Sequence, residues 1–279
     1  MSIMVHKLPA SNKPTLAEAG KWYAKRLSTQ DKRLVDGWLL QWGAIPLEKI
    51  TSQWVKAQIT DPRLEEVSPG RVRRELAVFN ALLNHAHRAG LMDKVWVERP
   101  SVDDRRLVWL TKHDRDAMIA AAEPVRFKAV VGFLFHTGAR LNEALGARQS
   151  DVRDGCVEFV SHKGAGKVTH RRVVPIRKNL ATLISAGLEG YSGPWLLPSP
   201  KGVRWHPRSV QRLWASLSAS LGHGPEVVPH VARHTFVSLL IQQGKDPQLV
   251  AKLTGHRDPR SLARYLHLDT NSLKAIIEE

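Results

Sequence analysis

The sequence is poor in cysteine, in long apolar runs and in acidic residues, and each shortage excludes a class of protein. Its 279 residues include a single cysteine, Cys156, which excludes both a disulfide scaffold and a multi-cysteine zinc site. The longest apolar run is about seven residues, Ala129 to Phe135, whereas a membrane helix needs about 20. The first residues also lack the apolar core of a secretory signal. We therefore expect a soluble protein that works in the reducing cytoplasm.

The shortage of acidic residues leaves a large positive charge. The chain has 42 Lys plus Arg and 26 Asp plus Glu, so its formal net charge is +16, whereas a small domain usually carries about 2–8 in magnitude. Residues 1–100 hold 16 basic and 10 acidic side chains, and the remainder hold 26 and 16. Such a charge predicts a polyanionic partner, either nucleic acid or an acidic membrane surface. Two basic lobes could contact a duplex from two sides. The charge alone is also compatible with an ordinary solvated surface.

The first hundred residues predict a small bundle of amphipathic helices. Thr15 and Glu18 have the spacing of a capping box at the start of a helix. Ser68 precedes the longest helix and Gly90 ends it. Apolar side chains recur at helical spacing over four stretches, residues 16–27, 34–42, 47–59 and 72–86. We interpret these stripes as core, and we expect residues 1–98 to form one helical domain.

Residues 99–106 are predicted to link this domain to a second one, 107–279. The surrounding segment, 92–108, has no helical period and contains Pro100 and a mixed charge cluster. Beyond it, Thr111 is expected to cap a helix, and two β-rich segments, Cys156–Ser161 and Arg171–Ile176, are joined through a glycine-containing turn. Helices are expected near 112–122, 125–137, 178–187, 206–221, 231–243, 246–254 and 258–267. The predicted fold class is therefore mainly α, with a small antiparallel sheet in a second domain of mixed, mostly α, type.

Three segments of the second domain carry residues suited to chemistry: TGARLNEAL from Thr137, PHVARHTF from Pro229 and TGHRDPRSLARYLHL from Thr254. Arg140 is expected in the first turn of a helix, and His230 and Arg233, three apart, share a helix face. A zinc site is a weak alternative. His230 and His234 have the spacing of a zinc pair, but a metalloprotease needs Glu where Val231 stands, and no carboxylate lies within the turn. No metal is expected.

Phosphate chemistry accounts for the same residues better. Guanidinium groups bind phosphate oxygens through paired, charge-assisted hydrogen bonds. Two arginines, a lysine and two histidines around one phosphorus would stabilise its transition state, and a tyrosine hydroxyl could attack it to form a phosphotyrosine. All of these residue types lie in the second domain.

The ordered set resembles the signature of the tyrosine recombinase (phage integrase) family. That signature is an Arg in a TGxRxxE segment, then HxxR, then Gly-His, then Tyr nine residues later, and the likeness extends over about residues 15–279. The resemblance implies that Arg140 and Arg233 hold the scissile phosphate and that Tyr265 is the nucleophile. It also implies that His230 acts as general acid/base on the tyrosine proton and that His256 donates a hydrogen bond to the phosphate.

The resemblance further implies a lysine on the β-hairpin that protonates the leaving 5′ hydroxyl. Lys163 fits the family pattern better, and Lys167 is the alternative. Glu143 is expected to buttress Arg140 rather than react. Two departures from the family pattern, Ala232 and Thr254 where Leu is usual, are interpreted as packing positions.

By resemblance, the chain is expected to be a site-specific DNA recombinase with a helical core-binding domain and a catalytic domain. It would cleave and rejoin strands through a 3′-phosphotyrosine without metal or other cofactor. Its expected partners are double-stranded DNA, further copies in a homo-tetramer on two DNA sites and an accessory DNA-bending protein, with no membrane. It would act in the cytoplasm, associated with the nucleoid. Candidate DNA contacts are Arg71, Arg73, Arg74, Arg88 and Lys167. A catalytically silent architectural protein and an enzyme that only relaxes supercoils are the alternatives.

Overall fold

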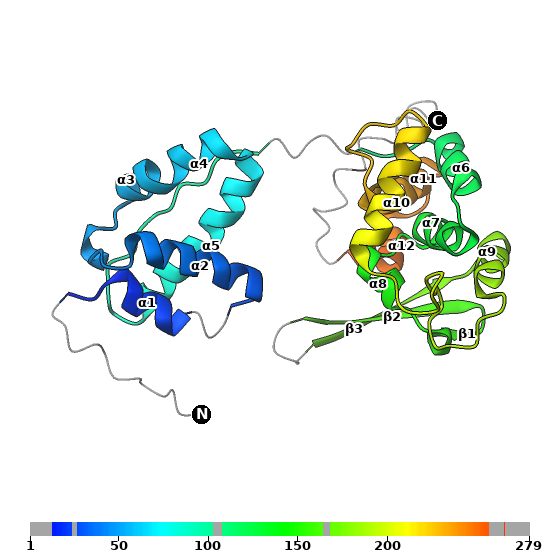
Figure 1. Ribbon diagram of the computed structural model, residues 1–279, viewed down its shortest axis with the longest axis horizontal. Coiled ribbons are helices and arrows are strands. Elements are labelled where there is room, and N and C mark those ends of the chain that lie inside the picture. The colour runs from blue at the N-terminus through cyan, green and yellow to red at the C-terminus, as the bar shows by residue number, and fades with distance from the viewer. Residues whose placement is uncertain (1–12, 24–26, 103–107, 164–167, 257–264, 266–279) are drawn as a thin grey trace, which may run out of the picture. The chain divides into compact units, whose positions relative to one another are not determined.

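The computed structural model describes residues 13–23, 27–102, 108–163, 168–256 and 265. The chain divides into two compact units, Met1–Asp104 and Arg105–Glu279, each with a hydrophobic core of its own (Figure 1). The boundary falls inside the segment predicted as a linker, residues 99–106. The described parts are mostly helical with one small antiparallel sheet, which confirms the predicted fold class.

The first unit is built from helices around one long helix, α5. Its elements are α1 (Leu16–Tyr23), α2 (Thr29–Trp42), η2 (Leu47–Lys49), α3 (Ser52–Val55), η3 (Lys56–Thr60), α4 (Asp61–Glu66) and α5 (Pro69–Arg88). The predicted capping box is confirmed, because the Glu18 carboxylate accepts from the Thr15 N–H at 2.7 Å and the Thr15 hydroxyl accepts from the Glu18 N–H at 3.4 Å. The apolar stripe of α5 is buried, and Phe79 packs edge-on against Trp38 of α2.

The helix predicted over residues 47–59 is wrong in its bounds. A 3₁₀ turn, η2, comes first, and Thr51 then caps a new helix that runs through α3, η3 and α4. Within it, η3 is a π-helical segment in which the Asp61 N–H bonds to the carbonyl of Lys56, five residues back. Pro62 follows directly and has no N–H to continue the ladder, and a wider turn of this kind is one way in which a helix accommodates such a break.

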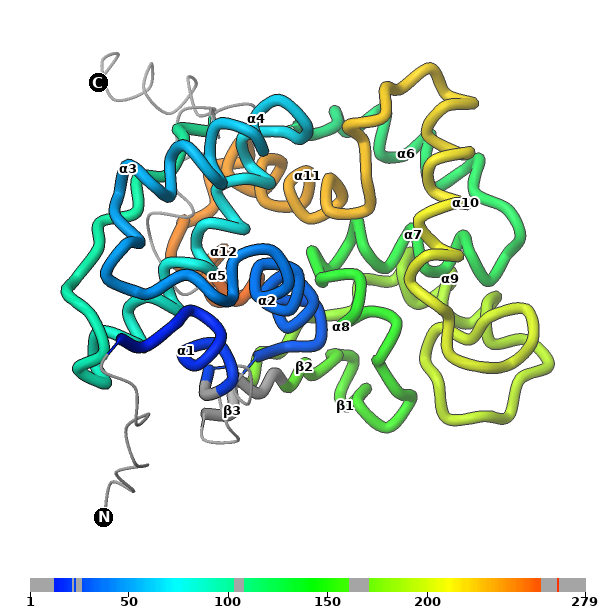
Figure 2. Tube along the Cα trace, turned by 60° about the vertical axis from the view of Figure 1, so that its left-hand side comes forward, coloured from blue at the N-terminus to red at the C-terminus, as the bar shows by residue number. Residues whose placement is uncertain are grey.

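The second unit is organised around α7 (Val125–Thr137), whose side chains are mostly buried. Figure 2 shows its trace among the other helices of this unit. Helix α7 contacts α6 (Lys112–Ala121), α8 (Leu141–Gly146), α9 (Lys178–Leu188) and α11 (Pro229–Gln242). A helix that is apolar all round is expected at the centre of a domain, which explains the long apolar run in the sequence. The remaining helices are η4 (Gln149–Asp151), α10 (Pro207–Ser220) and α12 (Pro247–Thr254). The helix expected over 258–267 lies outside the described residues, except that Tyr265 is helical.

The sheet has the order β1 (Val152–Arg153), β2 (Cys156–Lys163) and β3 (Val168–Pro175). The β2–β3 hairpin is longer than predicted, since pairing continues to Lys163 opposite Val168. Strand β1 escaped prediction because it is only two residues long. Its signal is the Asp-Gly dipeptide at 154–155, whose two positive φ angles, 48° and 69°, allow a two-residue hairpin turn.

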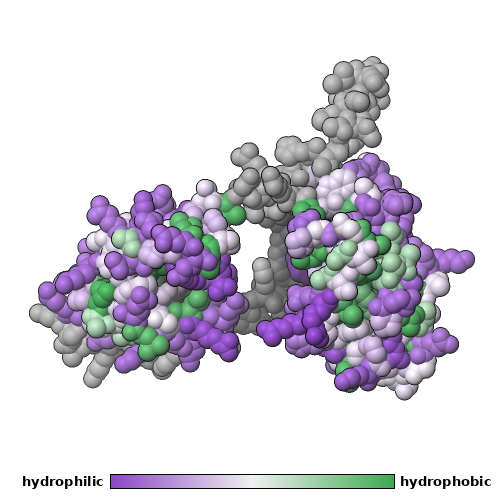
Figure 3. Space-filling view, turned by 45° about the horizontal axis from the view of Figure 1, so that its top comes forward, coloured by the Kyte–Doolittle hydropathy of each residue, from purple (hydrophilic) through white to green (hydrophobic). Residues whose placement is uncertain are grey.

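The surfaces that Figure 3 shows are mainly hydrophilic, with hydrophobic side chains at scattered positions. The most exposed large apolar side chains include Leu40 and Trp96 in the first unit and Leu249 in the second. Among the described helices, none combines the length and apolar character needed to span a membrane.

Candidate active site

A glycine turn at the end of α7 positions Arg140. Gly138 has φ +61°, and a Cβ there would lie 2.6 Å from Cδ1 of Phe236, so only glycine fits both the conformation and the space. The Thr137 hydroxyl donates to the carbonyl of Phe133 at 2.6 Å and closes the last turn of α7. The chain then reverses into α8, with Arg140 as its extended N-cap residue rather than in its first turn as predicted.

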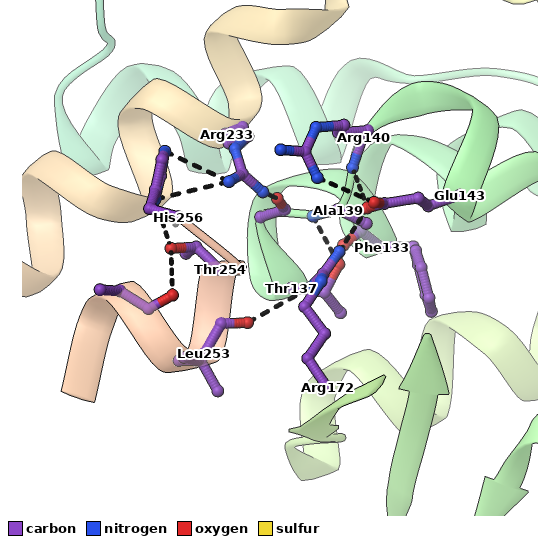
Figure 4. Close-up of polar contacts among 12 residues, drawn as sticks. Phe133, Thr137, Ala139, Arg140, Glu143, Arg172, Arg233, Leu253, Thr254 and His256 are labelled. Carbon is purple, nitrogen blue, oxygen red and sulfur yellow. Dashed lines mark hydrogen bonds and ion pairs between the residues drawn. The ribbon is translucent and has the colours of Figure 1, made fainter. Parts of the chain in front are cut away.

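Glu143 joins Arg140 to a second arginine, Arg172 of β3 (Figure 4). Its carboxylate accepts from the backbone N–H and from Nη1 of Arg140, each at 2.9 Å, and from Nη2 of Arg172. Arg172 also donates to the carbonyl of Leu253 at 3.2 Å and lies over the ring of Phe159. Burial alone would raise the pKa of Glu143, but Arg172 and Arg140 together hold that pKa below its usual value. Glu143 is therefore a carboxylate that orients Arg140, as expected.

Arg172 was missed by the sequence analysis. Its side chain is 9% exposed, and burial lowers the pKa of its guanidinium despite the attraction of Glu143. The signal was strand alternation, because residues 172 and 174 share a face of β3 and Val174 is buried. An arginine on the buried face of a strand needs a partner, which here is Glu143.

Arg233 is the most deeply buried cation of the site, with 2% of its surface exposed. Its Nη1 donates to the carbonyl of Gly138 at 2.8 Å, which ties α11 to the turn before Arg140. Burial, followed by the nearby charges of Arg140 and Arg172, lowers the pKa of Arg233 to about 10. The guanidinium stays protonated at neutral pH, and these arginines outnumber the one carboxylate among them. Such a cluster favours binding of an anion.

A second glycine turn, at the end of α12, brings in His256. Gly255 has φ +70°, and the His256 N–H bonds to the carbonyl of Ala251 at 3.0 Å, as in a Schellman motif. A Cβ on Gly255 would lie 3.0 Å from Cδ of Arg172. His256 then lies beside Arg233, with Nη2 of that arginine 3.2 Å from its Nε2.

Thr254 determines which nitrogen of His256 carries the proton. The Thr254 hydroxyl lies 2.6 Å from the carbonyl of Val250, which can only accept, and 2.6 Å from Nδ1 of His256. Since a hydroxyl has one hydrogen, Nδ1 must donate to Thr254, and Nε2 is left to accept from Arg233. Burial, together with Arg233 and Arg140, lowers the pKa of His256 to about 4, so the ring is neutral. The expectation that Thr254 only packs is therefore wrong, whereas Ala232 is fully buried as expected.

Tyr265 is buried beside α11, with 1% of its surface exposed. Its hydroxyl lies 2.5 Å from Nδ1 of His234, a residue to which the sequence analysis gave no role in phosphate chemistry. The ring of His230, an exposed residue, packs edge-on against that of His234 at 4.5 Å between centroids. Partial burial of the imidazole, followed by the charges of Arg233 and Arg140, lowers the pKa of His230. In the sequence, the only indication of a role for His234 was its spacing of four residues from His230, which places both rings on one face of the helix. Apolar side chains surround Tyr265: Phe236, Val237, Leu240, Ile241 and Val250.

The hairpin lysine stays a prediction. Lys163 is the last residue of β2 and its backbone pairs with Val168, while Lys167 lies outside the described residues. No three His, Cys, Asp or Glu side chains in the described ranges are grouped so that they could hold a metal ion.

The four arginines predicted to contact DNA all lie on α5 of the first unit and are exposed. Three have a partner: Arg71 bonds Glu75 at 2.7 Å, Arg73 the carbonyl of Pro100 at 3.0 Å and Arg74 Asp31 at 2.5 Å. Arg88, in the last turn, shows no such bond within the described residues. Their contact with DNA stays a prediction.

Guanidinium groups from three segments, a neutral histidine and a buried tyrosine thus lie together in a mostly α-helical domain. This combination defines a phosphoryl-transfer enzyme of the type that uses a tyrosine nucleophile. The chain belongs to the phage integrase family, whose family model matches residues 108–272 and so spans the whole site.

Individual relatives agree with this assignment. Tyrosine recombinase XerC of Pseudomonas fluorescens is 30% identical over 221 residues, which are 74% of this chain and 72% of that protein. The Tn1549 transposon integrase, solved with a circular intermediate DNA, matches 95% of this chain and 98% of that chain with a TM-score of 0.77 at 16% identity. A lambda integrase tetramer bound to a Holliday junction matches 88% of this chain and 76% of that chain, with a TM-score of 0.71 at 17% identity. The two structural likenesses concern the fold.

Proposed function

We propose that this chain is a site-specific DNA recombinase that cleaves and rejoins strands through a 3′-phosphotyrosine on Tyr265. The observation that carries the proposal is the meeting of Arg140, Arg233, His256 and Tyr265, which come from three segments of the second unit. Family membership and the recombinase XerC as a relative support the same activity.

The scissile phosphate binds between Arg140 and Arg233. Arg140 is half exposed and can reach a phosphate at the surface, while the buried Arg233 supplies a fixed guanidinium beneath it. Both are held in advance by protein acceptors, Glu143 and the carbonyl of Gly138, so little reorganisation is needed when charge develops on the phosphorus. His256 donates a hydrogen bond to the phosphate once Nε2 carries a proton, which requires that the bound phosphate replace Arg233 as the partner of that nitrogen.

Cleavage transfers the phosphorus from the 5′ oxygen of the leaving strand to the Tyr265 oxygen. The 5′ oxygen takes a proton from Lys163, or from Lys167 as the alternative, and departs as a hydroxyl. Rejoining reverses the step with the 5′ hydroxyl of a partner strand. No metal or nucleotide is required, because the energy of the broken bond is kept in the phosphotyrosine.

Recombination requires two duplexes and more than one copy of the chain. We expect a tetramer on two DNA sites, and the lambda integrase tetramer on a Holliday junction supports this stoichiometry. The first unit, 1–98 in the predicted division, acts as the core-binding domain. Among its candidate DNA contacts, Arg88 is the one that shows no side-chain bond within the described residues. An accessory DNA-bending protein and association with the nucleoid in the cytoplasm belong to the same proposal.

The test is covalent trapping on nicked suicide substrates. Wild-type protein is incubated with a library of nicked duplexes, and DNA that stays attached after denaturation is sequenced to identify the target. Wild type should form a phosphotyrosyl complex, and Tyr265→Phe should bind the same DNA without forming one. A complex that persists in Tyr265→Phe would refute the assignment of the nucleophile.

A plasmid with two copies of the recovered target then separates the possible activities. Recombined circles support the proposal. Relaxed plasmid without recombinants indicates a supercoil-relaxing enzyme, and binding without either product indicates an architectural protein.

A further inference from the structure

The hydroxyl of Tyr265 meets a histidine that lies outside the family signature. Nδ1 of His234 is 2.5 Å from the Tyr265 oxygen, and the two rings are 5.9 Å apart between centroids at an interplanar angle of 37°. Resting on the proposed function, we propose that His234 is a catalytic residue that accepts the proton of Tyr265 during strand cleavage and returns it during rejoining.

Burial explains why a protein group is needed as acceptor. With 1% of its surface exposed, Tyr265 offers bulk water almost no access to its hydroxyl. A phenol has a pKa of about 10 and an imidazole of about 6.5, so histidine is the side chain best suited to take the proton near neutral pH. The contact also satisfies the first requirement for a general base, which is hydrogen-bond reach of the proton it removes.

The neighbouring charges favour the product of that transfer. Burial lowers the pKa of Arg233, and a charge on Tyr265 acts in the opposite direction and raises it, which places the phenolate within electrostatic reach of the guanidinium. His234 follows Arg233 directly on α11, so one helix presents the base to the nucleophile and the cation to the phosphate. The ring of His230 packs edge-on against the ring of His234 and fixes it in place.

The proton balance of the reaction is complete with this assignment. In cleavage, the Tyr265 O–H proton moves to Nδ1 of His234 as the oxygen bonds to phosphorus, and the 5′ oxygen leaves with a proton from the hairpin lysine. In rejoining, the incoming 5′ hydroxyl gives its proton to that lysine, and the His234 imidazolium returns its proton to the departing Tyr265 oxygen. No proton is gained or lost over the cycle.

The kinetic test compares His234→Gln with two other histidine variants by single-turnover cleavage of the suicide substrate between pH 5.5 and 9.5. General-base catalysis contributes about 10²- to 10⁴-fold. We expect His234→Gln to lose a factor of this size at pH 7 with unchanged DNA affinity, and to recover as the pH approaches the pKa of tyrosine. His230→Gln should keep the wild-type shape of the pH profile, whereas the acid/base role that the family resemblance assigns to His230 predicts that this variant loses it. His113→Gln, whose side chain is 93% exposed on α6, is the matched neutral control.

Two results would overturn the assignment. One is a His234→Gln rate within threefold of wild type, and the other is a loss of rate that does not change with pH, as expected of a structural contact. If wild type itself forms no covalent complex with any DNA, the proposed function fails instead.

Nitrogen-15 NMR of histidine-labelled wild-type protein gives a test that needs a variant only for assignment of the signal. The His234 signal is assigned by its shift in Tyr265→Phe. The proposal requires an unprotonated Nδ1 in the free enzyme at neutral pH, and a protonated Nδ1 would refute it.

Discussion

Replacing Thr254 by valine removes one hydroxyl from the candidate site and keeps the shape of the side chain. Thr254 is fully buried, and its oxygen is the only acceptor that the described residues provide for the Nδ1 proton of His256. In the valine variant this proton has no partner, and a buried donor without a partner costs about 1–3 kcal/mol. The imidazole avoids the cost by moving its proton to Nε2, but Nε2 then faces the Nη2 donor of Arg233 at 3.2 Å. Either outcome disturbs the group that is to contact the phosphate.

The magnitude follows from that penalty. If the 1–3 kcal/mol is felt when the phosphate is bound at the transition state, Thr254→Val should slow single-turnover cleavage by about 5- to 150-fold. Thr254→Ser is the matched control, because serine keeps the hydroxyl and loses a buried methyl group. It should cost about 1 kcal/mol of unfolding free energy while cleaving at close to the wild-type rate. Urea denaturation and cleavage of the nicked substrate measure the two quantities separately.

The comparison of the two variants decides whether the hydroxyl or the packing matters. A serine variant as slow as the valine variant would show that the methyl group, and not the hydrogen bond, supports His256. A valine variant that cleaves at the wild-type rate would refute the role assigned to the Thr254 hydroxyl altogether.

Two further predictions concern charge in the same unit. Glu143→Gln leaves Arg172 buried without its carboxylate, and removing one partner of a buried ion pair costs about 3–5 kcal/mol. Urea denaturation should show a loss of unfolding free energy at the lower end of this range, because Glu143 is partly exposed, and cleavage should slow because Arg140 loses its partner. An unchanged unfolding free energy would contradict the network. His136 and His256 both have a pKa of about 4 in the folded protein, lowered chiefly by burial. Between pH 6.5 and 4 the unfolded chain binds more protons than the folded one, so stability should fall as the pH falls, by up to about 1.4 kcal/mol per unit for each histidine. Urea titrations from pH 4.5 to 8 measure the slope, which His136→Gln should reduce; a flat profile in wild type would be inconsistent with both shifts.

Local signals in the sequence were sufficient for most helices. The capping box at Thr15, the apolar run of α7 and the stripe of α5 each depend on residues within a few turns of one another, and each was predicted correctly. The stretch 47–59 failed because its apolar spacing continues across Thr51, which caps a new helix and separates the 3₁₀ turn η2 from α3.

The site itself was predictable only in its inventory. The order of the motifs identified Arg140, Arg233 and Tyr265, because family resemblance needs no geometry. The contacts that refine their roles join residues far apart in the chain: His234 reaches a tyrosine 31 residues on, and Arg172 reaches Leu253 across 81 residues. Periodicity within one element cannot supply such pairings, because they depend on how α11, α12 and β3 pack together.

Burial and an excess of positive charge together lower the pKa values of Arg233 and His256, and the positive charge also explains the preference of the site for phosphate. Arg140, Arg172 and Arg233 lie near a single carboxylate, Glu143, so the remaining positive potential opposes every further proton. That potential, added to burial, lowers the pKa of Arg233 to about 10 and keeps His256 neutral. A phosphodiester placed between the arginines carries the negative charge that the cluster lacks. Its arrival therefore relieves the repulsion among the cations and raises the pKa of His256, so that the group neutral in the free enzyme becomes a better hydrogen-bond donor when DNA is bound.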